Sequence, residues 1–189
     1  MLLETIRCEN GSPLHLSYHQ KRLERTLKTL QIIKHYDLDA IITPPSCGIF
    51  RCRFLYDSKG YTIEFHPYTP KKTTSLKLLT CDTLEYPLKY SAREQLNTLF
   101  EQRESCDDVL IVKNNYLRDT TIANIALFID GKWLTPTSPL LEGTTRERLL
   151  DEEFLTPASL MIEDIARASK VAIMNAMIGF IEVENGIIA

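Results

Sequence analysis

Hydrophobic and polar positions along the chain follow two different periods. The two-residue period of a half-buried strand runs over residues 2–8, and Asn10-Gly11 then supplies a hairpin turn. Leucine and isoleucine next recur at intervals of three and four residues, which predicts a helix over about 18–35, capped by Ser17. The chain is therefore expected to begin with a strand, a turn and an amphipathic helix.

Short apolar runs and turn signals divide the rest of the chain. They predict strands at 48–56, 61–68, 76–80, 109–112, 122–129, 132–134 and 170–174, and helices at 92–102, 146–153 and 158–168. Asp130-Gly131 is a strong hairpin signal between two of these strands. The connector at 81–91 is the expected boundary between a smaller N-terminal lobe, residues 1–84, and a larger C-terminal lobe, residues 85–189.

Composition narrows the class of protein. The 189 residues are 44% hydrophobic and 25% charged, which is ordinary for a globular protein. A net charge of -3 provides no field that attracts nucleic acid or an anionic membrane, and no apolar run approaches the roughly 20 residues that span a bilayer. Five cysteines without CxxC or zinc-like spacing indicate reduced thiols in a cytoplasmic protein and no metal site.

Residues 108–146 contain an acid and a small-residue turn at a short distance in sequence. Asp119 lies between two predicted strands, and Asn124 follows it by five residues. Asp119 is either a turn residue bonded to its own backbone or a carboxylate that keeps a heterocyclic nitrogen protonated. Gly143-Thr144-Thr145-Arg146 leads into a predicted helix. This turn is either an ordinary helix cap or a phosphate site made of backbone N–H groups and the Thr145 hydroxyl.

Two basic residues are further candidates. Lys89 lies between Leu88 and Tyr90 rather than in a run of charges. A lysine partly removed from water has a lowered pKa and can act as an amine nucleophile, whereas a surface lysine simply extends its ammonium into water. Arg22, three residues after His19, is either a surface arginine or a phosphate ligand. An amine, a carboxylate and a two-part phosphate clamp are together the set that pyridoxal phosphate needs.

The order of these motifs resembles that of the fold-type IV, class IV aminotransferase-like pyridoxal-phosphate enzymes. This family includes branched-chain and D-amino acid aminotransferases and aminodeoxychorismate lyase. The matching motifs are Leu3-Glu4-Thr5-Ile6-Arg7 with Asn10-Gly11, His19-Gln20-Lys21-Arg22-Leu23, Leu88-Lys89-Tyr90, Asp119 with Asn124, Trp133-Leu134-Thr135-Pro136, Gly143-Thr144-Thr145-Arg146 and Asn175-Ala176-Met177. The resemblance implies an α+β, two-lobed fold of the D-amino acid aminotransferase type, with a small N-terminal α/β lobe and a larger β-rich C-terminal lobe. It also implies a homodimer.

The same resemblance assigns roles at the cofactor, pyridoxal 5'-phosphate. The residues implied to contact it are Lys89, Arg22, Asp119, Asn124, Thr144, Thr145, Asn175 and Ala176. Lys89 takes the place of the catalytic lysine that forms the Schiff base, and Arg22 that of the phosphate-binding arginine. Asp119 replaces a glutamate that contacts the pyridine nitrogen and is one methylene shorter, so its backbone must come closer or a water must bridge. A second departure is expected at the N-terminus, where the chain begins at the strand that in relatives follows a pocket-lining segment.

Three functions remain open from the sequence. The first is a lyase that converts 4-amino-4-deoxychorismate to 4-aminobenzoate and pyruvate for folate biosynthesis, because Asn175-Ala176 resembles that branch. The second is a branched-chain or D-amino acid transaminase, and the third is a degenerate, non-catalytic member. The substrate in both catalytic cases is a small-molecule amine or amino acid. Arg51, Arg53 and Arg93 are candidates for binding its carboxylates, although solvated charge on a half-exposed strand explains Arg51 and Arg53 equally well.

Overall fold

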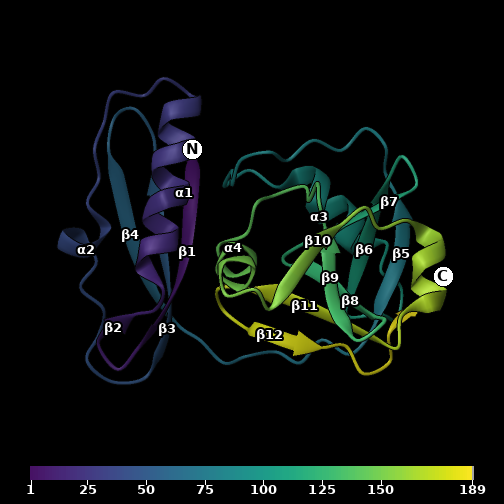
Figure 1. Ribbon diagram of the computed structural model, residues 1–189. Coiled ribbons are helices and arrows are strands. Elements are labelled where there is room, and N and C mark those ends of the chain that lie inside the picture. Colours follow the sequence, from purple (N-terminus) through teal and green to yellow (C-terminus); the bar gives the residue numbers. More distant parts are fainter. Residues whose placement is uncertain (189) are drawn as a thin grey trace. The chain divides into compact units, whose positions relative to one another are not determined.

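The structure is a computed structural model that describes residues 1–188, and its chain forms two compact units (Figure 1). The first unit consists of Met1–Pro70 and Leu88–Ala92, and the second of Lys71–Pro87 and Arg93–Ala189. Both units combine helices with sheets, which confirms the expected α+β class and the two lobes.

The boundary between the units differs from the one predicted at residues 84 and 85. β5 (Leu76–Thr80) pairs in parallel with β6 (Asp108–Lys113), so it belongs to the second unit. The segment 88–92 returns to the first unit, where the Leu3 amide donates to the Lys89 carbonyl at 2.9 Å. Each pairing joins residues far apart in sequence, so local composition could not reveal it.

In the first unit, strands form one antiparallel sheet in the order β2-β1-β3-β4. Its elements are β1 (Leu2–Glu9), β2 (Ser12–Pro13), α1 (Leu16–Thr29), α2 (Leu38–Ile41), β3 (Ile49–Tyr56) and β4 (Tyr61–Pro67). The three longer strands confirm the predictions at 2–8, 48–56 and 61–68. Leu23 and Leu27 of α1 pack with Ile6, Cys52 and Phe54 of the sheet to form the core of this unit.

The ends of α1 differ from the predicted helix over 18–35. Its N-cap is His15, in a left-handed conformation and without a side-chain cap bond, so Ser17 is not the cap. The helix ends where Gln31 adopts a φ of 55° and the Ile32 amide donates to the Leu27 carbonyl at 2.9 Å. This is the Schellman arrangement, with glutamine at the position that glycine usually takes. Ile33 is the last of the residues that share one face of the predicted helix (Leu23, Leu27, Leu30 and Ile33), and it is 98% exposed because it lies beyond the helix.

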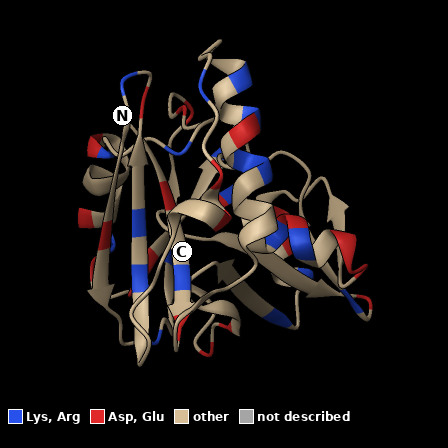
Figure 2. Ribbon diagram, turned by 90° about the vertical axis from the view of Figure 1, so that its left-hand side faces the viewer, with Lys and Arg blue, Asp and Glu red and all other residues tan. Residues whose placement is uncertain are grey.

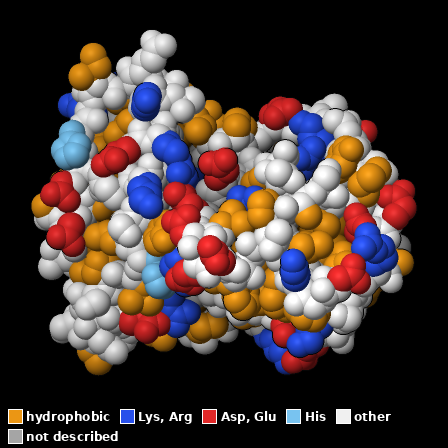
Figure 3. Space-filling view, in the orientation of Figure 1, with side chains coloured by type: hydrophobic (Ala, Val, Ile, Leu, Met, Phe, Trp, Pro, Cys, Tyr) orange, Lys and Arg blue, Asp and Glu red, His pale blue; other side chains and the backbone are white. Residues whose placement is uncertain are grey.

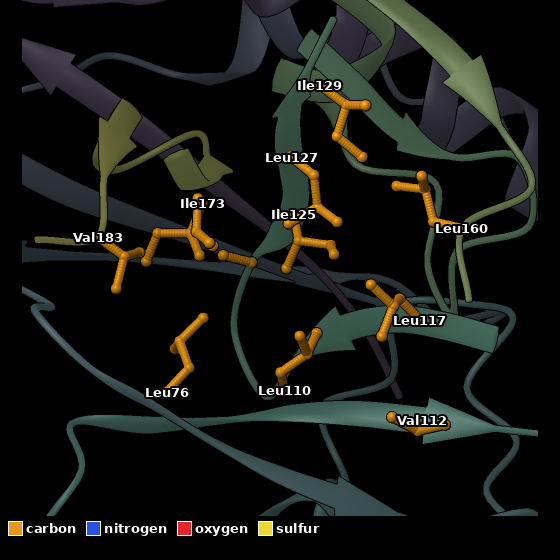
Figure 4. Close-up of a cluster of buried hydrophobic side chains, with 12 residues drawn as sticks. Leu76, Leu110, Val112, Leu117, Ile125, Leu127, Ile129, Leu160, Ile173 and Val183 are labelled. Atoms are coloured by element: carbon orange, nitrogen blue, oxygen red, sulfur yellow. The ribbon is translucent and has the colours of Figure 1, made fainter. Parts of the chain in front are cut away.

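The second unit is built on a larger sheet, whose path among the described residues is β10-β9-β8-β7-β6-β5-β13, with β11 paired to β8 and β12. Its elements are β5, α3 (Glu94–Glu101), β6, β7 (Tyr116–Thr120), β8 (Asn124–Ile129), β9 (Lys132–Pro136), α4 (Thr144–Asp151), β10 (Leu155–Ala158), η1 (Ile162–Arg167), β11 (Lys170–Asn175), β12 (Gly179–Glu182) and β13 (Ile187–Ile188). Figure 4 shows the main core of this unit, where Leu110, Leu117, Ile125 and Ile173 meet from four different strands.

The second unit differs from the prediction at two places. The stretch predicted as a helix over 158–168 is the end of β10 followed by the short 3-10 helix η1. β7 was not predicted, and it contains Asp119. Asp119 therefore lies within a strand and not between strands. The alternation of polar and apolar residues in β7 is obscured because Asp119, a charged residue, is buried.

Charges are mixed along the surface elements. Figure 2 shows basic and acidic positions interleaved along the helices, and Figure 3 shows acidic and basic side chains intermingled across the face that it draws. No helix within residues 1–188 combines the length and the apolar character needed to cross a membrane.

Candidate functional site

One cluster of candidate residues, in the first unit, is centred on Glu4 of β1. Glu4 lies on the same face of the strand as Leu2, Ile6 and Cys8 and is completely buried. Its carboxylate accepts hydrogen bonds from His19 Nδ1 at 2.7 Å, from Arg22 Nε at 2.8 Å and from an Arg22 terminal nitrogen at 2.5 Å. His19 and Arg22 lie three residues apart on α1, so their side chains can project from the same side of the helix, and both contact Glu4 of β1.

The ionisation of this cluster follows from its contacts. Burial alone would raise the pKa of Glu4, but the charge of Arg22 and the hydrogen bonds from His19 and Arg22 lower it to about 2. Burial lowers the pKa of His19, and its bond to Glu4 only partly opposes this. Glu4 is therefore an anion that holds the guanidinium of Arg22 in a fixed orientation through two of its five N–H groups.

Lys89 belongs to the same unit. Its segment pairs with the start of β1, through the Leu3–Lys89 backbone bond and an antiparallel bridge between Leu2 and Tyr90. The side chain is half-buried, and its charge contributes to lowering the pKa of His19. The lysine proposed as nucleophile is thus fixed by its backbone next to the strand that carries Glu4.

A second cluster of candidate residues, in the second unit, is centred on Asp119 of β7. Asp119 pairs with Asn124 of β8, and Asn124 Nδ2 donates to Asp119 Oδ1 at 2.8 Å. The Leu141 amide donates to Asp119 Oδ2 at 2.8 Å, while Asn124 Nδ2 also reaches the Leu141 carbonyl at 2.8 Å. The spacing of five residues noted in the sequence therefore corresponds to a hairpin, in which the acid Asp119 and the amide Asn124 are opposite each other on adjacent strands.

Burial dominates the ionisation of Asp119. It raises the pKa of this carboxyl to about 6, although hydrogen bonds from Asn124 and Leu141 and the charge of Arg146 act in the opposite direction. A cation near Asp119 would favour the carboxylate form. The site is thus suited to a cationic partner, such as a protonated ring nitrogen.

The start of α4 lies beside this pair. Gly143 is its N-cap, and within the described chain no side chain caps the helix. Thr144 and Thr145, both buried, form its first turn. An uncapped helix start has backbone N–H groups without intrahelical partners and the positive end of the helix dipole, which together favour an anion.

The side chain of Asn175 is hydrogen-bonded to backbone groups of the protein itself. Its Nδ2 donates to the Ile122 carbonyl at 3.1 Å, and its Oδ1 accepts from the amides of Met177 and Ile178 at 2.8 and 3.1 Å. Ala176 lies in the turn between β11 and β12. Asn175 therefore connects the turn after β7 to the turn after β11, and its predicted contact with a cofactor remains a prediction.

The three arginines considered for substrate carboxylates have different surroundings. Arg53 donates to Glu64 at 2.8 Å across two strands, and Arg93 donates to the Thr121 carbonyl at 2.5 Å. Arg51 is exposed on β3. Arg53 is thus already paired with an acid and Arg93 with a backbone group, which weakens both as substrate ligands.

Sequence reasoning gave no individual role to three residues of these two clusters, although each lies in a motif quoted above. Glu4 could have been found, because a charged residue on the otherwise apolar face of a strand needs a buried partner. Gly143 was noted only as part of the turn Gly143-Thr144-Thr145-Arg146. Its φ of -76° is ordinary, and only the structure shows that a Cβ at this position would meet Asn124. Arg146 is also buried, and it donates to the Pro136 carbonyl at 2.7 Å, a contact between segments that no spacing predicts.

Comparison with known proteins shows the family to which this chain belongs. The family model described as amino-transferase class IV matches residues 75–185. A protein of Haemophilus influenzae is 37% identical over 184 residues, which cover 94% of this chain and 98% of that protein.

Two solved structures are similar along nearly their whole length. One, from Haemophilus somnus, is provisionally named a 4-amino-4-deoxychorismate lyase; it has a TM-score of 0.89 and 34% identity, over 94% of this chain and 96% of that one. The other, from Mesorhizobium loti, is provisionally named an amino-acid aminotransferase; it has a TM-score of 0.82 and 25% identity, over 99% of both chains. The expected fold type is therefore confirmed.

Proposed function

Because the chain belongs to the class IV aminotransferase family and is a pyridoxal-phosphate-dependent enzyme, we propose that it is a lyase that converts 4-amino-4-deoxychorismate to 4-aminobenzoate and pyruvate. The observation that carries the choice of reaction is the similarity to the Haemophilus somnus structure, at 34% identity over 96% of that chain. The product, 4-aminobenzoate, is a precursor in folate biosynthesis, and we propose that pathway as the setting.

The residues of the second unit fit the cofactor. The uncapped start of α4 offers backbone N–H groups and two threonines to a phosphate. Asp119 is a buried acid that a protonated pyridine nitrogen would stabilise as a carboxylate. The two features are joined through Asn124, which is bonded to Asp119 and lies against Gly143. The proposed phosphate site and the proposed ring site would thus be joined by the side chain of Asn124.

Each residue has a separate task in this proposal. Bound pyridoxal phosphate supplies an aldehyde that condenses with amines and a ring that accepts electrons from the bond that breaks. Lys89 Nζ would hold the aldehyde of the cofactor and would move protons as general base and acid. An Asp119 oxygen would accept a hydrogen bond from the protonated ring nitrogen. Thr144 and Thr145 would bind the phosphate. By the family resemblance Arg22, which Glu4 keeps in orientation, would bind it as well.

The proposal is tested with purified protein and 4-amino-4-deoxychorismate. We expect 4-aminobenzoate and pyruvate in equal amounts, and we expect Lys89→Ala to abolish their formation, whereas Lys132→Ala, at an exposed hairpin residue, serves as the matched control. Borohydride reduction with bound cofactor should label Lys89 alone. Labelling of another lysine would contradict the assignment of Lys89, and absence of 4-aminobenzoate would contradict the lyase reaction.

A class IV transaminase is the second candidate, and the similarity to the Mesorhizobium loti structure favours it. The same purified protein would be offered amino acids with 2-oxoglutarate as amino acceptor. Formation of keto acid without any 4-aminobenzoate would select this alternative. Lys89, Asp119 and the start of α4 would have the same tasks in both reactions.

We further propose that the protein is a cytoplasmic homodimer that acts on a small-molecule amine. The five free thiols agree with a reducing compartment, and the dimer follows from the family resemblance. Sedimentation equilibrium checks the oligomeric state directly. A mass of 21.7 kDa, that of one chain, at micromolar concentration would contradict the dimer.

A further inference from the structure

The turn of residues 120–123, which starts at the last residue of β7 and leads into β8, joins Asp119 to Asn124, the pair at the proposed ring site. It is closed by the Thr120 amide, which donates to the Ala123 carbonyl at 2.8 Å. The Thr120 hydroxyl accepts from the Ile122 and Ala123 amides at 3.2 and 3.0 Å. Because Asp119 immediately precedes this turn and Asn124 immediately follows it, the conformation of the turn sets their relative positions.

Side chains from three other segments bind this turn. Arg93, just before α3, donates to the Thr121 carbonyl at 2.5 Å. The Thr121 hydroxyl donates to Asp108 Oδ1 at 2.7 Å, at the start of β6. Asn175, at the end of β11, donates to the Ile122 carbonyl at 3.1 Å. Two successive carbonyls and one hydroxyl of a four-residue turn are thus fixed from outside it.

Asp108 is the least expected member of this set. It is only 2% exposed, and its Oδ1 also accepts from the Val109 amide at 2.8 Å. Its Oδ2 is buried and has no hydrogen-bond partner among the described residues. A buried carboxyl with one oxygen unpaired destabilises the fold unless the contacts of the other oxygen compensate. A leucine in this place would avoid that cost but would lose the bond to Thr121.

We propose that Arg93, Asp108 and Thr121 are positioning residues that fix the turn of residues 120–123 and so hold Asp119 where it can contact the ring nitrogen of bound pyridoxal phosphate. The inference rests on the proposed contact between Asp119 and that nitrogen. Small displacements of a group that must meet a cofactor atom are costly, so a turn held from three sides is an effective support. Arg93 also directly follows the segment 88–92 that contains Lys89.

The test compares Thr121→Val with Thr121→Ser, and Arg93→Met with Arg93→Lys. The measurements are the dissociation constant for pyridoxal phosphate and the pH midpoint of the absorbance change of the bound cofactor. We expect Thr121→Val and Arg93→Met to weaken cofactor binding about tenfold, as expected for the loss of a buried hydrogen bond. Thr121→Ser should bind within about twofold of the wild type, because the hydroxyl is retained. Both disruptive variants should move the pH midpoint in the same direction as Asp119→Asn.

Matched controls come from α3 and the turn that follows it, where the same kinds of bond occur on the surface. Thr98 donates to the Glu94 carbonyl at 3.0 Å, and Arg103 donates to the Phe100 carbonyl at 3.0 Å. Thr98→Val and Arg103→Met should leave both measurements unchanged. If Thr121→Val and Arg93→Met lower only the melting temperature, and Asp119→Asn does move the midpoint, the positioning role is refuted while the contact of Asp119 stands. If Asp119→Asn does not move the midpoint either, the contact itself is refuted and the inference with it.

Discussion

The side-chain oxygen of Asn124 lies where residue 143 would carry a Cβ. A Cβ built on Gly143 would be 1.9 Å from Asn124 Oδ1, far inside van der Waals contact. Asn124 in turn donates to Asp119 at 2.8 Å. Glycine at the start of α4 is therefore required by the packing of the Asn124 side chain and not by the backbone, whose φ is -76°.

Gly143→Ala should consequently displace Asn124 and break its bond to Asp119. We expect a loss of about 1–3 kcal/mol in the free energy of unfolding, from overpacking and an unsatisfied buried group, and about tenfold weaker cofactor binding. Chemical denaturation and cofactor titration measure the two effects. Gly60→Ala is the control, because a Cβ there would meet no atom within 4 Å. Equal effects of both substitutions would contradict this explanation.

Glu4→Gln should destabilise the first unit strongly. It would leave the buried guanidinium of Arg22 without its anion, and breaking such a pair costs about 3–5 kcal/mol. Glu64→Gln, which removes a half-exposed partner of Arg53 on the same sheet, should cost at most about 1 kcal/mol. Urea unfolding at pH 7 gives both values. A Glu4→Gln loss no larger than that of Glu64→Gln would refute the role of the buried pair.

The lowered pKa of Glu4 also predicts that the wild type loses stability in acid. The folded-state pKa of Glu4, about 2, lies below its ordinary value of 4.5, so the stabilisation is complete above pH 4.5 and is lost as the pH falls toward 2. Glu4→Gln lacks this titration. The difference in the free energy of unfolding between wild type and Glu4→Gln should therefore shrink on acidification. A difference that stays constant from pH 6 to pH 3 would contradict the lowered pKa.

Strong local signals were sufficient to predict most strands and hairpins but not the surroundings of the site. The turn at Asp130-Gly131 and the apolar run over 109–112 are decided by neighbouring residues, and both are found as expected. β7 was missed because Arg118 and Asp119 interrupt its apolar pattern. Asp119 is buried although it is charged, because Asn124 and the Leu141 amide donate hydrogen bonds to its carboxyl group. A buried polar residue thus conceals the strand that carries it.

Long-range contacts were the other part that the sequence could not predict. The family motifs identified Arg22 and Asn124, but the bond of Arg22 to Glu4 joins positions 18 residues apart on a helix and a strand. The end of α1 was also missed, because Gln31 closes the helix in a conformation for which glycine is the usual signal. Residue types and spacings can suggest which chemistry a chain carries, whereas the partners that orient each group depend on the folded structure.

Asp119 should make the stability of the cofactor-free protein depend on pH in the opposite sense to Glu4. Burial raises the pKa of Asp119 from 3.8 to about 6, so its favourable contribution is complete below pH 3.8 and is lost as the pH rises through 6. The free energy of unfolding of wild type relative to Asp119→Asn should fall by up to about 3 kcal/mol over this range. Denaturation at pH 4 and pH 7 checks this, and an increase with pH would contradict it.

The threonines at the start of α4 can be tested as phosphate ligands by comparing two forms of the cofactor. Thr145→Val should weaken binding of pyridoxal phosphate about tenfold, since a hydrogen bond to a charged group is lost. Binding of pyridoxal, which has no phosphate, should be unchanged. Thr145→Ser keeps the hydroxyl and should resemble the wild type toward both forms. An equal loss for both cofactor forms would instead indicate that the threonine supports the fold, because only a ligand of the phosphate can distinguish the two.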